Sequence, residues 1–329
     1  MHGYLHDLKT GNKVVISGES SDWADVDSGV PQGSVLGPIL FIIFINDIDD
    51  AAEIIELLNK FADDTKAGQT IRSPEDNIKL QTALNKLFAW AETWGMKFNI
   101  DKCKVLHLGK KNPCYSYLMN GVELSKSDAE KDLGIWMTRD LKPSIQCTEA
   151  YRISCAMLNQ ISCAFHYRDR FVFLRLYKTY VRCHLEFSTP VWSPWLKGDI
   201  ELLEKVQEKA VGMISGLKGK TYTEKLKELD ILSLADRRTR FDLIKVFKII
   251  KGIDKVPFNT WFEFQPGRSS RGSHHLNIKL KFRKTDVAKN FFSLRAARNW
   301  NELPNNIKDS PNLYCFKKQL DKHMFGGQN

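Results

Sequence analysis

The stretch Phe61-Ala62-Asp63-Asp64 separates two short apolar runs, residues 54–58 and 65–71. An aromatic residue followed by two acids between such runs predicts a β-hairpin with both carboxylates at its tip. Successive side chains of a strand point to opposite faces, so the two acids can serve one site only where the chain turns sharply. The sequence therefore predicts a tight turn at residues 61–64.

Two carboxylates at a hairpin tip are suited to holding a divalent cation against a nucleotide phosphate. Magnesium takes one or two protein carboxylates and fills its other positions with phosphate and water. Asp is also common in ordinary polar turns. The pair alone therefore leaves a metal site and a plain turn both open, and the choice depends on the motifs around it.

Several further motifs follow one another in a fixed order along the chain. They are Ser28-Gly-Val-Pro-Gln-Gly-Ser-Val-Leu-Gly-Pro-Ile-Leu-Phe41, Ile45-Asn-Asp-Ile48, Phe61-Ala-Asp-Asp-Thr-Lys66, Trp94-Gly-Met-Lys-Phe-Asn-Ile-Asp-Lys-Cys-Lys104, Lys131-Asp-Leu-Gly-Ile135, Phe165-His-Tyr-Arg-Asp169, Pro190-Val-Trp-Ser-Pro-Trp195 and Phe291-Phe-Ser-Leu-Arg-Ala296. The series resembles the reverse transcriptases of non-LTR (LINE-type) retrotransposons. The resemblance covers almost the whole chain and implies an RNA-directed DNA polymerase, a nucleotidyltransferase of a transposable element.

The resemblance implies a role for each matching residue. Asp63 and Asp64 would be the catalytic, metal-binding acids, with magnesium as cofactor of the complete enzyme and Phe61 packed beneath them. Gln32 and Gly33 would lie under the templating base pair, Lys102 near the phosphates of the incoming dNTP, and Leu133-Gly134 in the hairpin that holds the 3′ end of the primer. Without the resemblance, these would be a tight turn, a solvated charge and a strand with a bulge.

Charge is divided unevenly along the chain, whose net charge is +10. Residues 1–140 carry 15 Lys and Arg against 21 Asp and Glu, whereas residues 141–329 carry 34 against 18. A basic second part predicts sequence-independent contact with phosphates, although charged side chains also merely solvate helix faces. The candidate clusters are Arg237, Arg238 and Arg240; Lys245, Lys248 and Lys251; and Arg268–Arg271 with Lys279, Lys281, Arg283 and Lys284.

Targeting features are absent from the sequence. No apolar run approaches the ~18 residues that a membrane span needs, and the first residues lack a signal-peptide pattern. The seven cysteines are scattered and include no Cys-x-x-Cys pair, which favours free thiols. We expect a cytoplasmic or nuclear protein that is not secreted, has no membrane partner, and binds an RNA template and a DNA primer as an RNA–DNA duplex.

Periodicity and turn residues predict an α+β fold. We expect strands at 13–17, 97–108 and 132–136, hairpins at Phe61–Asp64 and Asn120-Gly121, and a buried helix at 35–48. Ser73 is expected to cap a helix that Gly95 ends. Helical periodicity covers 143–164, 169–187, 199–216, 222–229, 235–251, 286–301 and 311–324.

These elements divide into three expected regions. Residues 1–140 would form a partial polymerase palm, an antiparallel sheet with helices; 141–256 an α-helical thumb bundle; and 257–329 a small basic C-terminal extension. The family's palm has a further Asp upstream of the Pro-Gln-Gly turn, whereas residues 1–27 match the segment that follows that Asp. We therefore expect a polymerase fragment without fingers and first catalytic Asp, inactive alone. The alternatives are a non-catalytic nucleic-acid-binding module and a decayed element relic.

Overall fold

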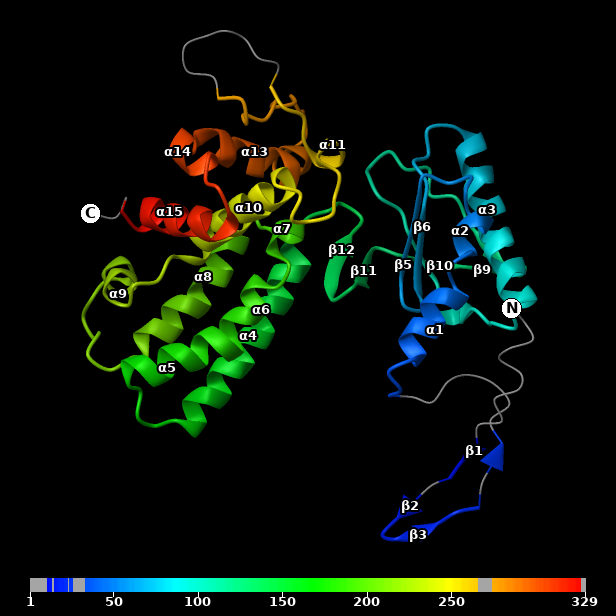
Figure 1. Ribbon diagram of the computed structural model, residues 1–329, viewed down its shortest axis with the longest axis horizontal. Helices are drawn as coiled ribbons and strands as arrows, with labels where there is room; N and C mark the ends of the chain where they lie inside the picture. The colour runs from blue at the N-terminus through cyan, green and yellow to red at the C-terminus, as the bar shows by residue number, and fades with distance from the viewer. Residues whose placement is uncertain (1–10, 14, 23, 26–32, 266–273, 327–329) are drawn as a thin grey trace. The chain divides into compact units, whose positions relative to one another are not determined.

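The computed structural model describes residues 11–13, 15–22, 24–25, 33–265 and 274–326 (Figure 1). The chain divides into two compact units. The first comprises residues 1–105 and 113–125, and the second residues 106–112 and 126–329. The expected Gln32 and Arg268–Arg271 lie outside the described residues.

In its described residues, the first unit combines short antiparallel strand pairs with three helices. The pairs are β1 (Gly11–Asn12) with β4 (Ala24–Asp25), β2 (Val15–Ile16) with β3 (Glu19–Ser20), β5 (Leu57–Phe61) with β6 (Asp64–Gly68), and β8 (Leu118–Met119) with β9 (Val122–Glu123). β7 (Lys104–Leu106) and β10 (Ser125–Ser127), which pair with each other, each cross the boundary between the two units. The helices are α1 (Gly37–Phe44), α2 (Ile48–Ala51) and α3 (Pro74–Thr93), and η1 (Ile100–Lys102) is one 3₁₀ turn.

Helix α3 begins and ends where the sequence predicts. Ser73 and Asp76 form a capping box, and Pro74 occupies the first helical position, where its missing N–H costs nothing. Gly95 follows the helix with φ 68°, a left-handed conformation that favours glycine. The helix buries Ala83 and Leu87 against Ile48 and Ala52, which makes it the centre of this unit's core.

Helix α1 is not the buried helix that the apolar run at 35–48 predicts. Ile39, Ile42 and Ile43 are 52 %, 62 % and 56 % exposed. Among the described residues, the aromatic contacts of this helix run from Phe44 to Trp90 and Trp94. An apolar helix is buried only where neighbouring elements cover every face, and the described part of the unit covers one face, from Gly37 to Ile45, and leaves the other exposed.

The expected strands at 97–108 and 132–136 are also corrected. Asn99 accepts a hydrogen bond from the Lys102 N–H through its side chain, which bends residues 100–102 into η1. Only Lys104–Leu106 remains extended. Leu133 and Gly134 instead form the turn between β11 (Ala129–Asp132) and β12 (Ile135–Thr138). The hairpin predicted at Asn120-Gly121 is confirmed, with both residues at positive φ.

The second unit consists of the β11–β12 hairpin and helices. The helices of residues 141–256 are α4 (Ser144–Ala164), α5 (Arg170–Leu176), the π-helical turn η2 (Tyr177–Val181), α6 (Arg182–Glu186), α7 (Thr189–Trp192), α8 (Lys197–Gly212), α9 (Tyr222–Glu228) and α10 (Leu234–Ile250). Those that follow are α11 (Phe258–Trp261), α12 (Asp286–Lys289), α13 (Phe292–Glu302), α14 (Asn305–Lys308) and α15 (Leu313–Gly326). The helical periodicity of the sequence is thus confirmed.

The first core of this unit lies among α4, α8 and the helices between them. Leu158, Val181 and Leu203 are fully buried there. A polar network crosses the core, because the Gln207 amide accepts from the Tyr177 hydroxyl at 2.8 Å and donates to the Tyr222 hydroxyl and the Leu232 carbonyl at 2.9 and 3.0 Å. Burial raises the pKa of Tyr177, which therefore stays a hydrogen-bond donor.

The second core packs the C-terminal helices on α10. Phe247 of α10 stacks on Phe316 of α15 with ring centroids 4.2 Å apart, and Trp300 of α13 is fully buried beside them. Helix α10 contributes Leu234 to the first core and Phe247 to the second, and thus connects the two cores within this unit. Figure 1 shows α10 running between α13 and α15.

The described residues as a whole mix helices with small antiparallel sheets, as an α+β fold does. Within them, no helix combines the length and the apolar character that crossing a bilayer requires.

Candidate active site

The two acids Asp63 and Asp64 lie at the tip of the β5–β6 hairpin. Phe61 pairs with Asp64, so the turn consists of only two residues, Ala62 and Asp63. Ala62 adopts φ 51°, a left-handed conformation that costs a residue with a Cβ roughly 1–2 kcal/mol. The chain therefore turns as sharply as the sequence predicts, and both carboxylates reach the tip exposed to solvent.

The two faces of the hairpin differ in burial. Leu58, Lys60, Thr65 and Ala67 face the unit's interior, and Leu58 and Ala67 pack on the cluster around α3. Phe61 points the other way and is 64 % exposed. The expectation that Phe61 packs beneath the tip is therefore wrong, because the period-2 register that buries Leu58 turns Phe61 outward.

Lys60 fixes the hairpin to the turn after α1. Its ammonium lies 2.9 Å from a carboxylate oxygen of Asp49 and donates to the carbonyls of Ile45 and Asn46 at 3.2 and 3.4 Å. Those carbonyls lie at the C-terminal end of α1, where intrahelical partners are lacking. Sequence reasoning missed this role of Lys60; a lone lysine on the inward face of a strand was the available indication.

A second contact holds the same turn from α3. The Trp90 indole N–H donates to the Asp47 carboxylate at 3.1 Å. The Asn46-Asp47 motif is thus bound on one side by the hairpin and on the other by α3. These contacts give the Asp63–Asp64 tip a fixed base within the first unit.

Gly33 lies four residues before α1 begins at Gly37. Its φ of 82° is left-handed and an added Cβ would meet nothing within 4 Å, so its backbone is open to an approaching group. Ser34 accepts a hydrogen bond from the Gly37 N–H at 3.0 Å and caps the start of the helix. Its neighbour Gln32 falls in the stretch that the structure does not describe.

Lys102 lies at the end of η1, which the Asn99 side chain orders. Its side chain is exposed, and its ammonium has no hydrogen-bond partner among the described residues. The spacing Asn-x-x-Lys therefore has a structural meaning: Asn99 caps the turn from which Lys102 projects. In the sequence, only this spacing distinguishes Lys102 from the nearby Lys104. In the structure, the Lys104 ammonium donates a hydrogen bond to the Ser125 hydroxyl at 2.7 Å.

Leu133 and Gly134 form the two-residue turn of the second unit's hairpin. Both have positive φ, 46° and 87°, as the right-handed twist of a two-residue hairpin demands. Leu133 is 54 % exposed at the tip. A Cβ on Gly134 would lie 3.4 Å from a ring carbon of Phe187, so the turn sits close against the helical bundle.

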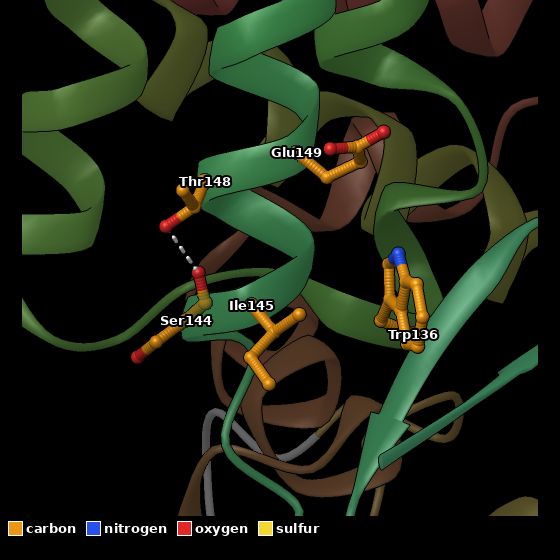
Figure 2. Close-up of a pocket in the computed structure, with 5 residues that line it drawn as sticks. All are labelled: Trp136, Ser144, Ile145, Thr148 and Glu149. Atoms are coloured by element: carbon orange, nitrogen blue, oxygen red, sulfur yellow. Dashed lines mark hydrogen bonds between the residues drawn. The ribbon is translucent and has the colours of Figure 1, made fainter.

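This hairpin is docked on the start of α4. The backbone N–H of Trp136 donates to the side-chain carbonyl of Gln146 at 3.0 Å, and Ile135 enters the helical core. Figure 2 shows Trp136 facing Ile145 and Glu149 across a pocket of ≈330 Å³, which Ser144 and Thr148 complete. Arg152 binds the Glu149 carboxylate through two hydrogen bonds and lowers its pKa.

The structure thus joins the expected site residues into two sets. Asp63 and Asp64 adjoin at one tip and Leu133 and Gly134 at another, in different units. Gly33 and Lys102 share the first unit with the two acids, but no hydrogen bond or ion pair among described residues connects them. Nor does a third His, Cys, Asp or Glu of the described chain complete a group of three with Asp63 and Asp64.

One group of three metal-ligand side chains does occur in the described residues, namely His274, His275 and Asp309. The Leu276 N–H donates to Nδ1 of His274 at 3.2 Å, and Nε2 lies 3.0 Å from the Asp309 carboxylate. A neutral ring with Nδ1 as acceptor carries its proton on Nε2 and donates it to Asp309. Both ring nitrogens of His274 thus have hydrogen-bond partners, and the bond to Asp309 holds the segment 274–276 in place.

Two of the basic clusters are engaged within the protein. Arg237 pairs with Glu186, Arg240 with Asp321, and Arg238 is 5 % exposed. Lys245 and Lys248 both pair with Asp254. Acids thus pair with Arg237, Arg240, Lys245 and Lys248 within the protein, whereas Lys251 is exposed. Contact of these clusters with phosphate stays a prediction. Lys279, Lys281, Arg283 and Lys284 remain exposed.

Comparison with known proteins connects these hairpins to a family. The family described as reverse transcriptase (RNA-dependent DNA polymerase) matches residues 3–137, which include both tips. The RNA-directed DNA polymerase from mobile element jockey of Drosophila melanogaster is 27 % identical over 236 residues, 68 % of this chain and 26 % of the relative. Its counterpart in Drosophila funebris is 27 % identical over 217 residues, 62 % and 23 % respectively.

The chain spans about a quarter of the length of these curated relatives. No solved structure is significantly similar to it. The relatives are polymerases of mobile elements, and their match extends past residue 137 into the helical unit, since it covers more residues than the family match. The chain is therefore similar to the reverse transcriptases of mobile elements, over residues 3–137 in the family match and over 68 % of its length in the match to the jockey polymerase.

Proposed function

We propose that this chain supplies part of the catalytic machinery for RNA-directed DNA synthesis, with Asp63 as the principal metal-holding acid and Asp64 as its partner. The observation that supports this most is the β5–β6 hairpin, which carries two exposed carboxylates at a two-residue turn. Lys60 and Leu58, on the opposite face of the same strand, hold the hairpin to the rest of the unit. A plain polar turn would not need that fixation.

The donor set at the tip fits magnesium. Asp63 and Asp64 offer carboxylate oxygens, and Mg²⁺ accepts one or two of these together with phosphate and water. The bound ion would stabilise charge on the phosphoryl oxygens of an incoming dNTP. The protein's own part is to hold Asp63 and Asp64 at a fixed position, which the short turn and the Lys60 contacts do.

The remaining site residues are proposed to position nucleic acid and nucleotide. Leu133, held at positive φ on the docked hairpin, would contact the 3′ end of a DNA primer. Lys102 would approach the dNTP phosphates, and Gln32 and Gly33 the base pair formed with the RNA template. In this proposal residues 1–140 form a palm, 141–256 a thumb and 257–329 a C-terminal extension.

Primer extension tests the proposal. The chain would be fused behind the part of the jockey polymerase that precedes its matched region, and dNTP incorporation measured on a primed RNA template with Mg²⁺ or Mn²⁺. We expect incorporation by the fusion that Asp63→Ala removes. Residues 1–329 without the fusion should be inactive, because two-metal catalysis needs a bridging carboxylate beyond this pair. Asp63-dependent synthesis by the chain alone would contradict that expectation.

A further inference from the structure

A second pocket of ≈330 Å³ lies in the second unit. Apart from Leu141, the residues that line it fall between Trp261 and Leu294, far in sequence from both hairpin tips. Apolar side chains form its interior, among them Phe262, Ile278 and Leu294. Its volume is within the range of small-ligand sites. The residues that line it come from α11, α12, α13 and the extended segment 278–283.

Aromatic rings form one wall of this pocket. Trp261 and Phe291 lie nearly parallel, at 20°, with ring centroids 6.0 Å apart. Trp261 is 37 % exposed and Phe291 50 % exposed, so both rings keep a solvent-accessible face. Phe292, which is buried, supports Trp261 edge-on at 5.9 Å. Exposed aromatic faces held by a buried ring are suited to stacking on another flat ring.

The opposite wall is held rigidly by α13. The Asn301 side chain bonds both the N–H and the carbonyl of Ile278 at 2.8 Å, and the Trp300 indole donates to the Leu276 carbonyl at 2.8 Å. Backbone bonds between residues 263–265 and 277–279 complete the frame. These bonds fix the backbone at residues 276–279, and the side chains that follow start from that fixed position.

Those side chains make the rim basic. In this segment, Lys279, Lys281 and Arg283 line the pocket together with Ile278, whereas Leu280 and Phe282 do not. Glu263 pairs with Lys279 at 2.9 Å and Lys281 at 3.5 Å, and the Lys279 hydrogen bond lowers its pKa. Arg283 and Lys284 have no ion-pair partner within the described residues. The rim therefore retains positive charge.

We propose that this pocket binds an unpaired nucleotide of single-stranded nucleic acid, with the base against Trp261 and Phe291 and the adjoining phosphates on Lys281 and Arg283. The inference takes nucleic acid as the partner from the proposed function, and it assigns that partner a second site, separate from the Asp63–Asp64 tip. Exposed aromatic rings beside positive side chains match the flat base and the negative phosphate of a nucleotide. Stacking of a base on an aromatic ring does not depend on sequence. In a duplex each base is covered by its neighbours, so the pocket should bind single strands in preference to duplexes.

The test uses the full 329-residue chain and fluorescein-labelled twelve-residue oligothymidylate in EDTA, read by anisotropy. We expect an affinity about tenfold higher than for the same strand with abasic central residues, because each stacked base contributes on that scale. Trp261→Ala should remove this tenfold preference and Trp261→Phe should keep it. Circular dichroism would verify that both variants are folded.

Charge reversal tests the rim separately. Lys281→Glu with Arg283→Glu should weaken binding about tenfold and flatten the salt dependence by about 1.4 in log–log slope, two contacts at roughly 0.7 each. Lys318→Glu with Lys322→Glu on α15 makes the same charge change at exposed positions outside the pocket and should leave the slope unchanged.

Three results would overturn the inference: equal affinity for the intact and abasic strands, equal effects of the two double variants, or displacement of the oligonucleotide from this site by an acidic peptide at lower concentration than by unlabelled strand. Because metal and dNTP are absent from this assay, its failure leaves the proposed polymerase function untouched. Loss of primer extension in the Asp63 variant would equally leave this binding site intact.

Discussion

The ammonium of Lys60 lies 2.9 Å from the carboxylate of Asp49, which fastens the strand leading into Asp63 to the turn after α1. Lys60 also donates to the Ile45 and Asn46 carbonyls, so one side chain serves three acceptors. The position of the acidic tip therefore depends on a residue that itself carries no chemistry.

Lys60→Met keeps the aliphatic stem and removes these hydrogen bonds. We expect the first unit to lose about 1 kcal/mol, a small value because Asp49 is 59 % exposed and solvent screens the pair. Urea denaturation followed by circular dichroism measures the change. Lys86→Met, at an exposed position on α3, is the control; an equal effect of both variants would remove the anchoring role of Lys60.

Asp242 and Arg295 form a buried pair in the second unit, with two hydrogen bonds of 2.8 and 3.1 Å and side chains only 4 % and 15 % exposed. Asp242→Ala leaves the guanidinium buried without its carboxylate. The expected loss of stability is about 3–5 kcal/mol. Asp321→Ala breaks the more exposed pair with Arg240 and should cost about 1 kcal/mol. Urea midpoints that fall equally would contradict the burial argument.

The capping box of α3 predicts a pH dependence. The backbone N–H of Arg72 binds the Asp76 carboxylate and lowers its pKa from the ordinary value of 3.8. The folded state thus favours the ionised form, and its stabilisation is present above pH 3.8 and disappears as the pH falls through the lower folded-state pKa. Asp76→Asn should flatten the stability curve between about pH 4 and 2. Asp101→Asn, an acid outside the capping box, is the control. Equal pH dependence of the unfolding free energy in the Asp76→Asn and Asp101→Asn variants would contradict this prediction.

Leu133 predicts opposite effects on stability and activity. A leucine at φ 46° bears left-handed strain, whereas asparagine tolerates that conformation. Leu133→Asn should raise the unfolding free energy by about 0.5–1 kcal/mol and slow primer extension by the jockey fusion. The extension rate at saturating primer and the urea midpoint are the two readouts. A stabilised variant with unchanged extension would remove the primer contact.

The sequence was most informative where short-range rules decide the structure. The Ser73 cap of α3, the turn at Ala62-Asp63 and the Asn120-Gly121 hairpin depend on residues within four positions of one another, and all three were predicted. The reciprocal bond from Asp76 that completes a capping box was not predicted. The helical periodicity of α4, α8 and α10 depends on a single face of each helix and was predicted for the same reason.

Distant partners explain what the sequence did not reveal. Glu186 and Asp321, which neutralise Arg237 and Arg240, lie 51 and 81 positions away. Lys60 meets Asp49 only because α2 folds back along the hairpin. The apolar run at 35–48 predicted a helix correctly, but its burial depends on which elements cover it. Roles at Gln32, Gly33 and Lys102 stay predictions, since no contact within the described residues connects them to the tip.

The central claim is that Asp63 at the hairpin tip holds the metal for DNA synthesis. Single-turnover dNTP incorporation by the jockey fusion, compared between wild type, Asp63→Asn and Asp64→Asn at equal Mg²⁺, tests it most directly. We predict a loss of about a thousandfold for Asp63→Asn, since the ion supplies several kcal/mol of charge stabilisation, and a smaller loss for Asp64→Asn. Incorporation by Asp63→Asn at the wild-type rate would contradict the account.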